Sequence, residues 1–489
     1  MTIKEMILGS LNSSPDTAAI EYRDGEELIS VSRRELHSRM NALGTYLLHK
    51  QGAGYIYILG ENSANWITVY FTAICGAGIA AGLEKDLPAD ELIDWGKRIG
   101  PGVIFYSGAY ESTVSGVMKS LPEHSFINMD SDDFSNALAE GERLLDAGSR
   151  LHIDSHTGSD DLAEILCTSG TSAARKGVMI SQKNVATITI HYRKTGMKPN
   201  QRYSILLPLH HCYGLGVLTW AIASGGTACI LPGFKRIFEN IKFFKPDFLS
   251  FVPALAAGLL SALDAYDLKG PDAVERFLGY KPFIVICGGA PIPLPVMEEL
   301  IARGLPLCDS FGMTETAGII STNPLEDIRP GTVGCPIDGC QVKIAPDGEI
   351  LLRGDNLMLG YLGSDGKPEF PNIDGWFATG DIGTFEDGYI SIKGRKKNII
   401  MLSNGKNVYP EELENKLMEP ASVSEVCIYQ EGEEIVAEVY SADSRETVLG
   451  DILEITRTWL SYQRPHRVEL REKPFERSAT NKIKRRNDH

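Results

Sequence analysis

A loop rich in hydroxyls follows the apolar residues 165–167. It reads Thr168-Ser169-Gly170-Thr171-Ser172-Ala173-Ala174-Arg175-Lys176-Gly177. Backbone N–H groups, hydroxyl donors and an ammonium group gathered in one loop suit a polyphosphate. The spacing fails the Walker A pattern G-x-x-x-x-G-K-[ST]. Taken alone, the segment fits a plain Ser/Thr turn equally well, so other motifs must decide between the two readings.

Two later segments carry groups that suit the rest of a nucleotide. The first reads Asp309-Ser310-Phe311-Gly312-Met313-Thr314-Glu315. Its aromatic ring beside a glycine can stack on a base, and its Thr-Glu pair can bind a phosphate oxygen and a hard cation. The second runs from Gly375 to Asp381, and its terminal carboxylate suits the two hydroxyls of a ribose. The alternative for Asp381 is a turn residue that caps its own backbone.

Basic segments follow in the last hundred residues. They are Gly394 to Lys397, Gly405 to Glu412 and Arg477 to Ile483. The run from Lys482 to Arg486 is strongly basic although the net charge of the chain is −16. We expect Lys484 to Arg486 to be solvated, whereas a lysine at a phosphate site is the other reading of this run.

The order of these segments resembles that of the adenylate-forming superfamily, which contains acyl-CoA synthetases, peptide adenylation domains and beetle luciferases. Two further segments agree with it, Pro208-Leu209-His210-His211 and Gly288-Gly289-Ala290-Pro291. The resemblance extends from about residue 20 to Arg486. Within the superfamily, Gly394 to Glu412 and Leu83 to Pro88 are most similar to long-chain-type fatty acyl-CoA synthetases.

The resemblance implies two half-reactions. A carboxylate first attacks the α-phosphate of ATP, which gives an acyl-adenylate and pyrophosphate; a thiol then displaces AMP. Lysine and Mg²⁺ at the α-phosphate would stabilise the charge that develops there. The implied cofactors are ATP, Mg²⁺ and coenzyme A, with a carrier-protein phosphopantetheine as the alternative thiol. The implied partner is a small-molecule carboxylic acid, and a carrier protein in the alternative case.

The resemblance also implies a role for each matching residue. Lys482, Thr314 and His211 would be catalytic, with Thr314 on the α-phosphate and Glu315 holding the metal. His211 and Gly288 would meet the acyl group, although His210 stays an alternative to His211. Lys397 would be the hinge of the C-terminal domain, and Gly405 would line the thiol tunnel. The residues expected to bind ATP or AMP are Thr168, Ser169, Gly170, Thr171, Ser172, Lys176, Gly289, Ala290, Pro291, Asp309, Ser310, Phe311, Gly312, Asp381 and Arg395.

Three positions depart from the pattern of the superfamily. Its phosphate loop reads Thr-Ser-Gly-Thr-Thr-Gly-x-Pro-Lys-Gly, whereas this chain has Ala173 for the second glycine and Arg175 for the proline. Alanine reaches positive φ only at a steric cost, while Arg175 adds a cation, so phosphate affinity need not fall. Asn481 replaces the glycine before Lys482 and tolerates left-handed geometry. A nucleotide-binding but inactive homologue therefore stays open as an alternative function.

The elements that must position these residues alternate between helix and strand. Arg34–Lys50 predicts an amphipathic helix, 55–59 a buried strand, and 64–82 a helix packed on that strand. The same rhythm recurs at 103–106, 205–207, 227–231, 248–251 and 283–287. It predicts an α/β fold whose large N-terminal part holds two doubly wound subdomains.

After about residue 331 the pattern changes to short strands with turns such as Asp347-Gly348 and Asp387-Gly388. We predict a small β-barrel-like subdomain at about 331–393, which completes an N-terminal core of residues 1–393. The polar stretch Gly394 to Lys397 would then link it flexibly to a small, mobile α+β domain at 394–489.

Composition limits the class of protein. The negative net charge argues against a nucleic-acid binder, because such proteins carry basic faces. The longest apolar stretch, residues 69–82, is too short to span a bilayer, and no signal peptide is evident at the N-terminus. The nine cysteines lack zinc-ligand spacing and predict reduced thiols in a cytoplasmic protein. Oligomeric state does not follow from the sequence.

Overall fold

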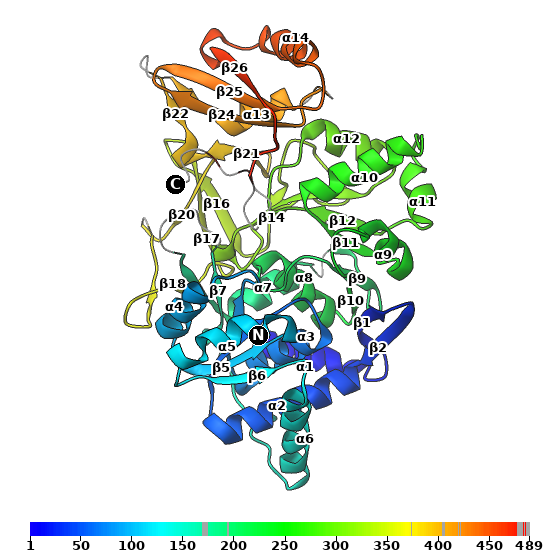
Figure 1. Cartoon of the computed structure of the whole chain (residues 1–489), viewed down its shortest axis with the longest axis vertical. Helices are drawn as coiled ribbons and strands as arrows, with labels where there is room; N and C mark the ends of the chain where they lie inside the picture. The colour runs from blue at the N-terminus through cyan, green and yellow to red at the C-terminus, as the bar shows by residue number, and fades with distance from the viewer. Residues whose placement is uncertain are drawn as a thin grey trace.

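The computed structural model describes residues 1–168, 175–192, 195–372, 374–402, 406–418, 420, 422–476, 483 and 485. Its architecture is α/β, as predicted, with two large sheets and three smaller ones in the described residues (Figure 1). No described helix is both long and apolar enough to cross a membrane. All nine cysteines are free.

The first large sheet has eight strands in the order β19-β18-β8-β7-β4-β3-β5-β6. Strands β7, β4, β3, β5 and β6 are parallel, while β8, β18 and β19 join antiparallel at one edge. The bounds are β3 Gly54–Leu59, β4 Gly78–Leu83, β5 Gly102–Tyr106, β6 Ser125–Asn128, β7 Leu162–Cys167, β8 Gly177–Ser181, β18 Gly360–Leu362 and β19 Pro368–Glu369.

The second large sheet has nine strands in the order β15-β14-β13-β12-β11-β9-β10-β1-β2. Its middle six strands are parallel, and antiparallel strands close both edges. The bounds are β1 Ala18–Asp24, β2 Glu27–Ser32, β9 Arg202–Ile205, β10 Thr227–Ile230, β11 Phe248–Phe251, β12 Ile284–Cys287, β13 Leu307–Phe311, β14 Ser321–Thr322 and β15 Cys335–Pro336.

Helices cover both faces of both sheets, which gives five alternating layers. The central layer lies between the sheets and shares one apolar core with them; it contains α1 Ile3–Ser13, α2 Arg33–Gln51, α3 Ala64–Thr72, α6 Asp132–Asp146, α7 Gln182–Tyr192 and α8 Cys212–Ala223. The outer face of the eight-stranded sheet packs on α4 Ala89–Ile99 and α5 Glu111–Val117. The outer face of the nine-stranded sheet packs on α9 Ile237–Phe244, α10 Pro253–Ala265, α11 Ala273–Leu278 and α12 Leu294–Ala302.

The helix predicted for residues 64–82 was wrong in its second half. Helix α3 ends at Thr72, a π turn covers Ala73–Ala77, and residues 78–83 form β4. Gly76 has φ +128°, which a helix cannot contain. The small side chains that follow then fit a strand buried between β3 and β7.

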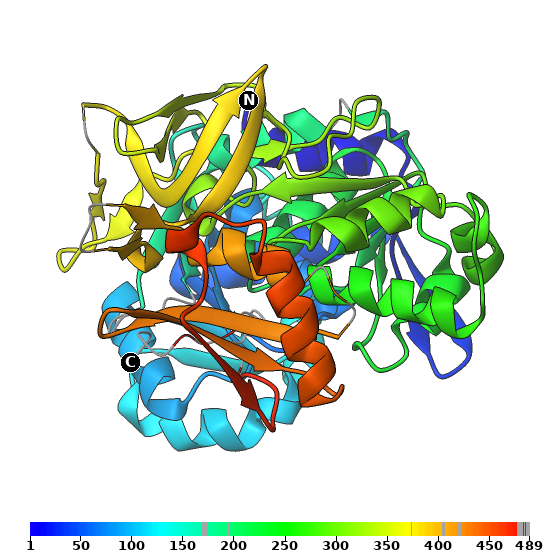
Figure 2. The same cartoon turned by 90° about the horizontal axis from the view of Figure 1, so that it is seen from above.

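Three smaller sheets complete the described part of the chain, and the smallest of them pairs β22 with β23. The order β16-β17-β20-β21 forms a four-stranded antiparallel sheet, and β24-β25-β26 forms a three-stranded one that packs with α13 and α14 (Figure 2). The bounds are β16 Cys340–Ile344, β17 Glu349–Gly354, β20 Phe377–Glu386, β21 Tyr389–Arg395, β22 Ile400–Met401, β23 Asn407–Val408, α13 Pro410–Leu417, β24 Glu425–Glu431, β25 Glu434–Tyr440, α14 Arg445–Thr456 and β26 Arg467–Arg471.

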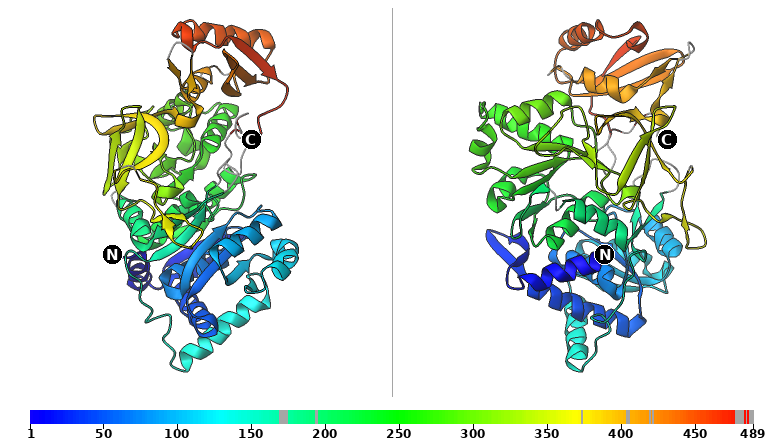
Figure 3. Two further views of the ribbon diagram at one scale, coloured as in Figure 1. Left: turned by 90° about the vertical axis from the view of Figure 1, so that its left-hand side faces the viewer. Right: turned by 180° about the vertical axis from the view of Figure 1, so that it is seen from behind.

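The last part of the chain has its own apolar core, which begins at Ile400 and includes side chains of α13, α14 and the three-stranded sheet. Figure 3 shows this part at one end of the molecule, beyond the four-stranded sheet. The polar stretch at 394–397 is not a free linker, because Gly394 and Arg395 belong to β21 and Lys396–Asn398 form a 3₁₀ turn.

Candidate functional site

The predicted phosphate loop connects two antiparallel strands, β7 and β8. Thr168 N donates to Lys176 O at 2.9 Å, and Lys176 N donates to Thr168 Oγ1 at 3.2 Å. These two bonds close the base of the loop at the edge where β7 ends. The predicted phosphate ligands Ser169, Gly170, Thr171 and Ser172, like Ala173, lie outside the described residues.

Three segments far apart in the sequence meet beside this loop. The ammonium group of Lys176 lies 4.3 Å from the centroid of the Tyr361 ring, and Tyr361 Oη donates to Glu315 Oε1 at 2.8 Å. Burial and the Glu315 carboxylate raise the pKa of Tyr361, so its hydroxyl stays a donor. The predicted phosphate lysine and the predicted metal ligand are thus joined through one aromatic residue. Sequence reasoning missed Tyr361, which only its position between two other motifs could have marked.

Glu315 fits the role of a magnesium ligand chemically. Mg²⁺ is usually bound by one or two carboxylates together with substrate phosphates and water. Glu315 supplies such a carboxylate next to Thr314, and both residues lie in the 3₁₀ turn Thr314–Thr316 that follows β13. No group of three or more His, Cys, Asp or Glu side chains that could hold a metal occurs in the described part of the chain.

His211 is the N-cap of helix α8, and the residue after it, Cys212, lies near Thr314. His211 Nδ1 accepts from Tyr213 N at 3.3 Å, which fixes the ring as the N-cap of the helix and places the ring proton on Nε2. Cys212 Sγ lies 3.8 Å from Thr314 Oγ1. His210 differs, because burial, together with the His211 and Lys85 charges, lowers its pKa to about 4. The structure therefore gives His211 a defined polar orientation and His210 a neutral, enclosed ring.

The carboxyl ends of β11, β12 and β13 meet the start of α8. Tyr213 Oη donates to Ile286 O at 2.9 Å, and Ser310 Oγ donates to Cys287 O at 3.0 Å. A Cβ on Gly288 would lie 2.7 Å from Ser310 Oγ, so a larger residue at this junction would require the Ser310 side chain to shift. Ligands of open α/β sheets bind at the carboxyl ends of the strands, which makes this edge the place for a small molecule.

Asp309 lies at the end of β13 and is 8% exposed. Burial raises the pKa of its carboxyl group to about 8, although the Ser310 N–H that donates to Oδ1 at 2.9 Å opposes this shift. Near neutral pH the group is therefore protonated, which removes a negative charge from this edge.

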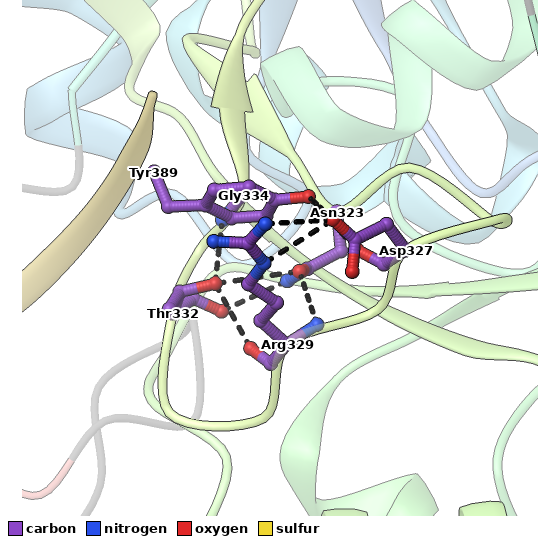
Figure 4. Close-up of polar contacts among 6 residues, drawn as sticks. All are labelled: Asn323, Asp327, Arg329, Thr332, Gly334 and Tyr389. Carbon is purple, nitrogen blue, oxygen red and sulfur yellow. Dashed lines mark hydrogen bonds and ion pairs between the residues drawn. The ribbon is translucent and has the colours of Figure 1, made fainter. Parts of the chain in front are cut away.

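The loop after β14 ties this edge to the four-stranded sheet (Figure 4). Asn323 N donates to Asp309 O at 3.0 Å, and Asn323 Oδ1 accepts from Arg329 N at 2.9 Å. The Arg329 guanidinium lies over the Tyr389 ring at 3.8 Å, while Tyr389 Oη and Arg329 Nη2 both donate to Asp327 Oδ2 at 2.8 Å. Because Tyr389 begins β21, this network fixes the position of the four-stranded sheet relative to the nine-stranded sheet.

Asp381 and Arg395 face each other across β20 and β21. Arg395 Nε lies 2.9 Å from Asp381 Oδ1, and Arg395 Nη1 donates to Thr379 O at 3.3 Å. The Asp381 side chain is only 5% exposed, so the ion pair holds the carboxylate in one orientation. The structure thus brings together the two residues that the sequence predicts for the ribose.

Two cations are paired with carboxylates. Arg175 forms ion pairs with Glu84 and Glu91, so its charge is already engaged by carboxylates. Arg485 of the basic tail is not solvated as predicted. Its guanidinium is largely buried, with Nη2 2.5 Å from Glu414 Oε2 and 3.5 Å from Glu411 Oε1 on α13.

Lys397, the predicted hinge, lies between two residues that are bound to different parts of the molecule. Lys396 Nζ contacts Asp347 Oδ2 and Glu349 Oε2, both at 2.7 Å, which binds it to the four-stranded sheet. Asn398 Nδ2 donates to Glu411 Oε1 at 2.5 Å, which binds it to α13. Residue 397 thus separates a residue bound to the four-stranded sheet from a residue bound to α13. Gly405, Asn481 and Lys482 lie outside the described residues.

Known proteins share this sequence pattern and fold. A family model described as AMP-binding enzyme matches residues 10–362. A long-chain-fatty-acid–CoA ligase of Mycobacterium tuberculosis, FadD15, is 26% identical over 461 residues, which span 83% of this chain and 76% of the relative. A 2-succinylbenzoate–CoA ligase of Listeria monocytogenes (serovar 1/2a) is 32% identical over 339 residues, 66% of this chain and 68% of the relative.

Solved structures show the same fold over nearly the whole chain. MatB of Rhodopseudomonas palustris with bound ATP has a TM-score of 0.83 at 24% identity and covers 99% of this chain and 97% of its own. The Bacillus subtilis o-succinylbenzoate–CoA synthetase MenE in complex with its acyl-adenylate has a TM-score of 0.81 at 23% identity, with 98% and 96% covered.

Proposed function

This chain belongs to the AMP-binding enzyme family, and we propose that it activates a carboxylic acid with ATP and transfers the acyl group to coenzyme A. The observation that carries the proposal is the convergence of Lys176, Tyr361 and Glu315 beside the carboxyl ends of the parallel strands. This arrangement offers cationic and carboxylate groups at one edge, where a magnesium–triphosphate can be bound.

In the first half-reaction a carboxylate oxygen forms a bond to the α-phosphorus, and the bond to the β-bridging oxygen breaks, so pyrophosphate leaves. Lys176 and Thr168 would bind the β- and γ-phosphates, and Thr314 would donate to the α-phosphate. Glu315 would hold Mg²⁺, which supplies positive charge to the departing pyrophosphate. Lys482 would stabilise the charge that develops on the α-phosphate, where it lowers the barrier most.

The nucleoside would lie between the carboxyl ends of β12 and β13, which would bind the adenine, and Asp381 on β20, which would bind the ribose. Gly289, Ala290 and Pro291, together with Asp309 to Gly312, would form the adenine slot, and Asp381 would accept from both ribose hydroxyls. The ion pair with Arg395 and the low exposure of Asp381 support this assignment, because an acceptor held rigid loses little entropy on binding. His211 and Gly288 would meet the acyl group at the start of α8.

The second half-reaction needs the lysine removed from the α-phosphate. The thiol sulfur then attacks the acyl carbonyl carbon, and the bond to the AMP oxygen breaks. Rotation of residues 398–489 about Lys397 would move Lys482 away from the α-phosphate. It would also bring Gly405 to the site, where Gly405 would line the channel through which the thiol enters. The two anchors on either side of Lys397 support a hinge at this residue.

Nine free cysteines support a reducing compartment, so we place the enzyme in the cytoplasm.

The function is tested by incubating the purified chain with ATP, Mg²⁺, a carboxylic acid and either coenzyme A or a phosphopantetheinylated carrier protein. We expect AMP and acyl-CoA in equal amounts. Transfer to the carrier alone would replace coenzyme A as the acceptor, and ATP binding without AMP formation from any acid would contradict the proposal.

Lys482→Ala serves as the matched variant. It should fail to form acyl-adenylate but convert pre-made acyl-adenylate to acyl-CoA at a rate within about threefold of the parent, because its charge serves only the first step. Equal loss of both steps would contradict the division of roles.

A further inference from the structure

Arg175 is fixed by two carboxylates at the base of the phosphate loop. Its Nη1 lies 2.6 Å from Glu84 Oε2 and its Nε lies 3.0 Å from Glu91 Oε2. Glu84 directly follows β4, and Glu91 lies in the first turn of α4. The Arg175 side chain is 28% exposed and that of Glu84 15%, so both groups are largely shielded from water. Charge-assisted bonds of this kind are stronger than exposed ion pairs.

The backbone of Arg175 is held from the same helix. Arg98, in the last turn of α4, donates from Nη1 to Arg175 O at 3.1 Å. The Arg98 guanidinium itself lies over the Trp95 ring at 4.5 Å, which limits its freedom. Helix α4 thus contacts Arg175 through its first and last turns, once at the side chain and once at the backbone.

The next residue is Lys176, whose position depends on this anchorage. The backbone of Lys176 is bonded to the backbone N–H and to the side-chain hydroxyl of Thr168, and its ammonium group lies over the Tyr361 ring. Proline, which the superfamily carries at this place, would restrict φ through its ring. Arginine has no such restriction, so the same rigidity must come from contacts outside the loop.

We propose that Arg175 is a positioning residue, whose ion pairs with Glu84 and Glu91 fix Lys176 for the β- and γ-phosphates of ATP. The inference rests on the proposed function, since it assumes that Lys176 binds those phosphates. It assigns Glu84 and Glu91 a part in nucleotide binding although neither carboxylate touches the nucleotide.

A direct role of Arg175 as a phosphate ligand predicts the opposite response to one substitution. Glu84→Gln removes one of the two ion pairs of Arg175 and keeps the shape of the side chain at residue 84. If Arg175 acts through position, this variant binds ATP less tightly. If Arg175 binds phosphate itself, the loss of a competing carboxylate makes ATP binding tighter.

The experiment measures the Kd of Mg²⁺–ATP and of AMP by calorimetry, without acid or thiol, for the parent and five variants. Arg175→Ala should weaken ATP binding about tenfold and Glu84→Gln about threefold, as expected for lost charge-assisted bonds. AMP binding should stay within about twofold in both, because AMP lacks the β- and γ-phosphates. Arg175→Pro should retain ATP binding within about threefold, since the ring restores the restriction on φ.

The double variant Arg175→Ala/Glu84→Gln should bind ATP no more weakly than Arg175→Ala, because both changes remove the same contact. Arg143→Ala on α6 alters an exposed ion pair with Glu140 and is the control that leaves both affinities unchanged. Tighter ATP binding by Glu84→Gln, unchanged binding by Arg175→Ala, or equal loss of ATP and AMP would overturn the proposal. A parent protein that binds neither nucleotide would instead contradict the proposed function.

Discussion

Asp309 shows how one buried group can set a pH dependence. Burial raises its pKa to about 8, so the carboxyl is neutral near pH 7 and does not repel a triphosphate at the carboxyl end of β13. As the pH rises through about 8, the group ionises and a negative charge appears in the proposed adenine slot.

We therefore predict that ATP affinity falls above about pH 8 in the parent and that Asp309→Asn removes this fall. The measurement is calorimetric Kd at several pH values from about 6 to 9, expressed as the ratio of parent to variant, so that titration of ATP itself cancels. A ratio that does not change with pH would show that Asp309 does not act on the nucleotide.

At the scale of residues, the sequence motifs predicted which residues form the site but did not predict which of these residues contact one another. Asp381 and Arg395 are predicted together, and the structure pairs them at 2.9 Å. Tyr361 was missed because it lies in the short strand β18, which pairs with β8 at only two residues. A strand this short has no hydrophobic period, and Tyr361 belongs to no motif with a fixed spacing. The partners of Arg175 were missed for a different reason: Glu84 and Glu91 lie more than eighty residues away and meet it only through the sheet.

At the scale of elements, hydrophobic patterns predicted β3, β5, β10, β11, β12 and one residue of β9, a minority of the strands of the two large sheets, and they did not predict the end of α3. Residues 64–82 are mostly apolar, so neither the helical nor the strand period separates helix from strand there, and Gly76 decides where the helix ends. The stretch 394–397 was predicted as a linker from its charge. Its charges are instead paired, Arg395 with Asp381 and Lys396 with Asp347 and Glu349.

Those pairings support the proposal that the two parts move about Lys397. Lys397→Pro should slow acyl transfer to coenzyme A more than about tenfold and change pyrophosphate exchange less than about threefold, because proline fixes φ at the hinge. Single-turnover rates of the two steps give the comparison. Lys397→Ala, which leaves φ free, is the control; equal slowing of both steps by Lys397→Pro would contradict the hinge.

At the scale of the whole molecule, a buried carboxyl between the eight-stranded sheet and the central helical layer links stability to pH. Glu164 of β7 accepts from Tyr70 Oη of α3 at 2.9 Å, and burial raises the pKa of Glu164 from 4.5 to about 7. Between these values the folded protein binds more protons than the unfolded chain. The contribution of Glu164 to the free energy of unfolding is therefore full below about pH 4.5 and is lost as the pH rises to about 7.

Glu164→Gln should remove this dependence, because its amide fills the same space without titrating. The difference in unfolding free energy between variant and parent should grow in favour of the variant, by an amount on the order of 3 kcal/mol, as the pH rises from about 4.5 to 7. Denaturant unfolding at matched pH values measures it. A difference in unfolding free energy that stays constant over this pH range would show that Glu164 is not the group whose titration changes the stability.

The α/β class follows from the alternating apolar segments, since a parallel sheet needs a crossover after each strand. The five-layer arrangement does not follow, because the order of strands in two interleaved sheets depends on contacts such as that between α1 and α8. The division of the chain at residues 393 and 394 remains a prediction, which the separate apolar core from Ile400 onward supports.

The central claim is that this site joins a carboxylate to the α-phosphate of ATP. ATP–pyrophosphate exchange tests it most directly, with labelled pyrophosphate and a panel of acids that varies chain length and aromaticity. The account predicts exchange that requires an acid and Mg²⁺ and is lost in Glu315→Ala. Measurable ATP binding with no exchange for any acid of the panel would contradict it.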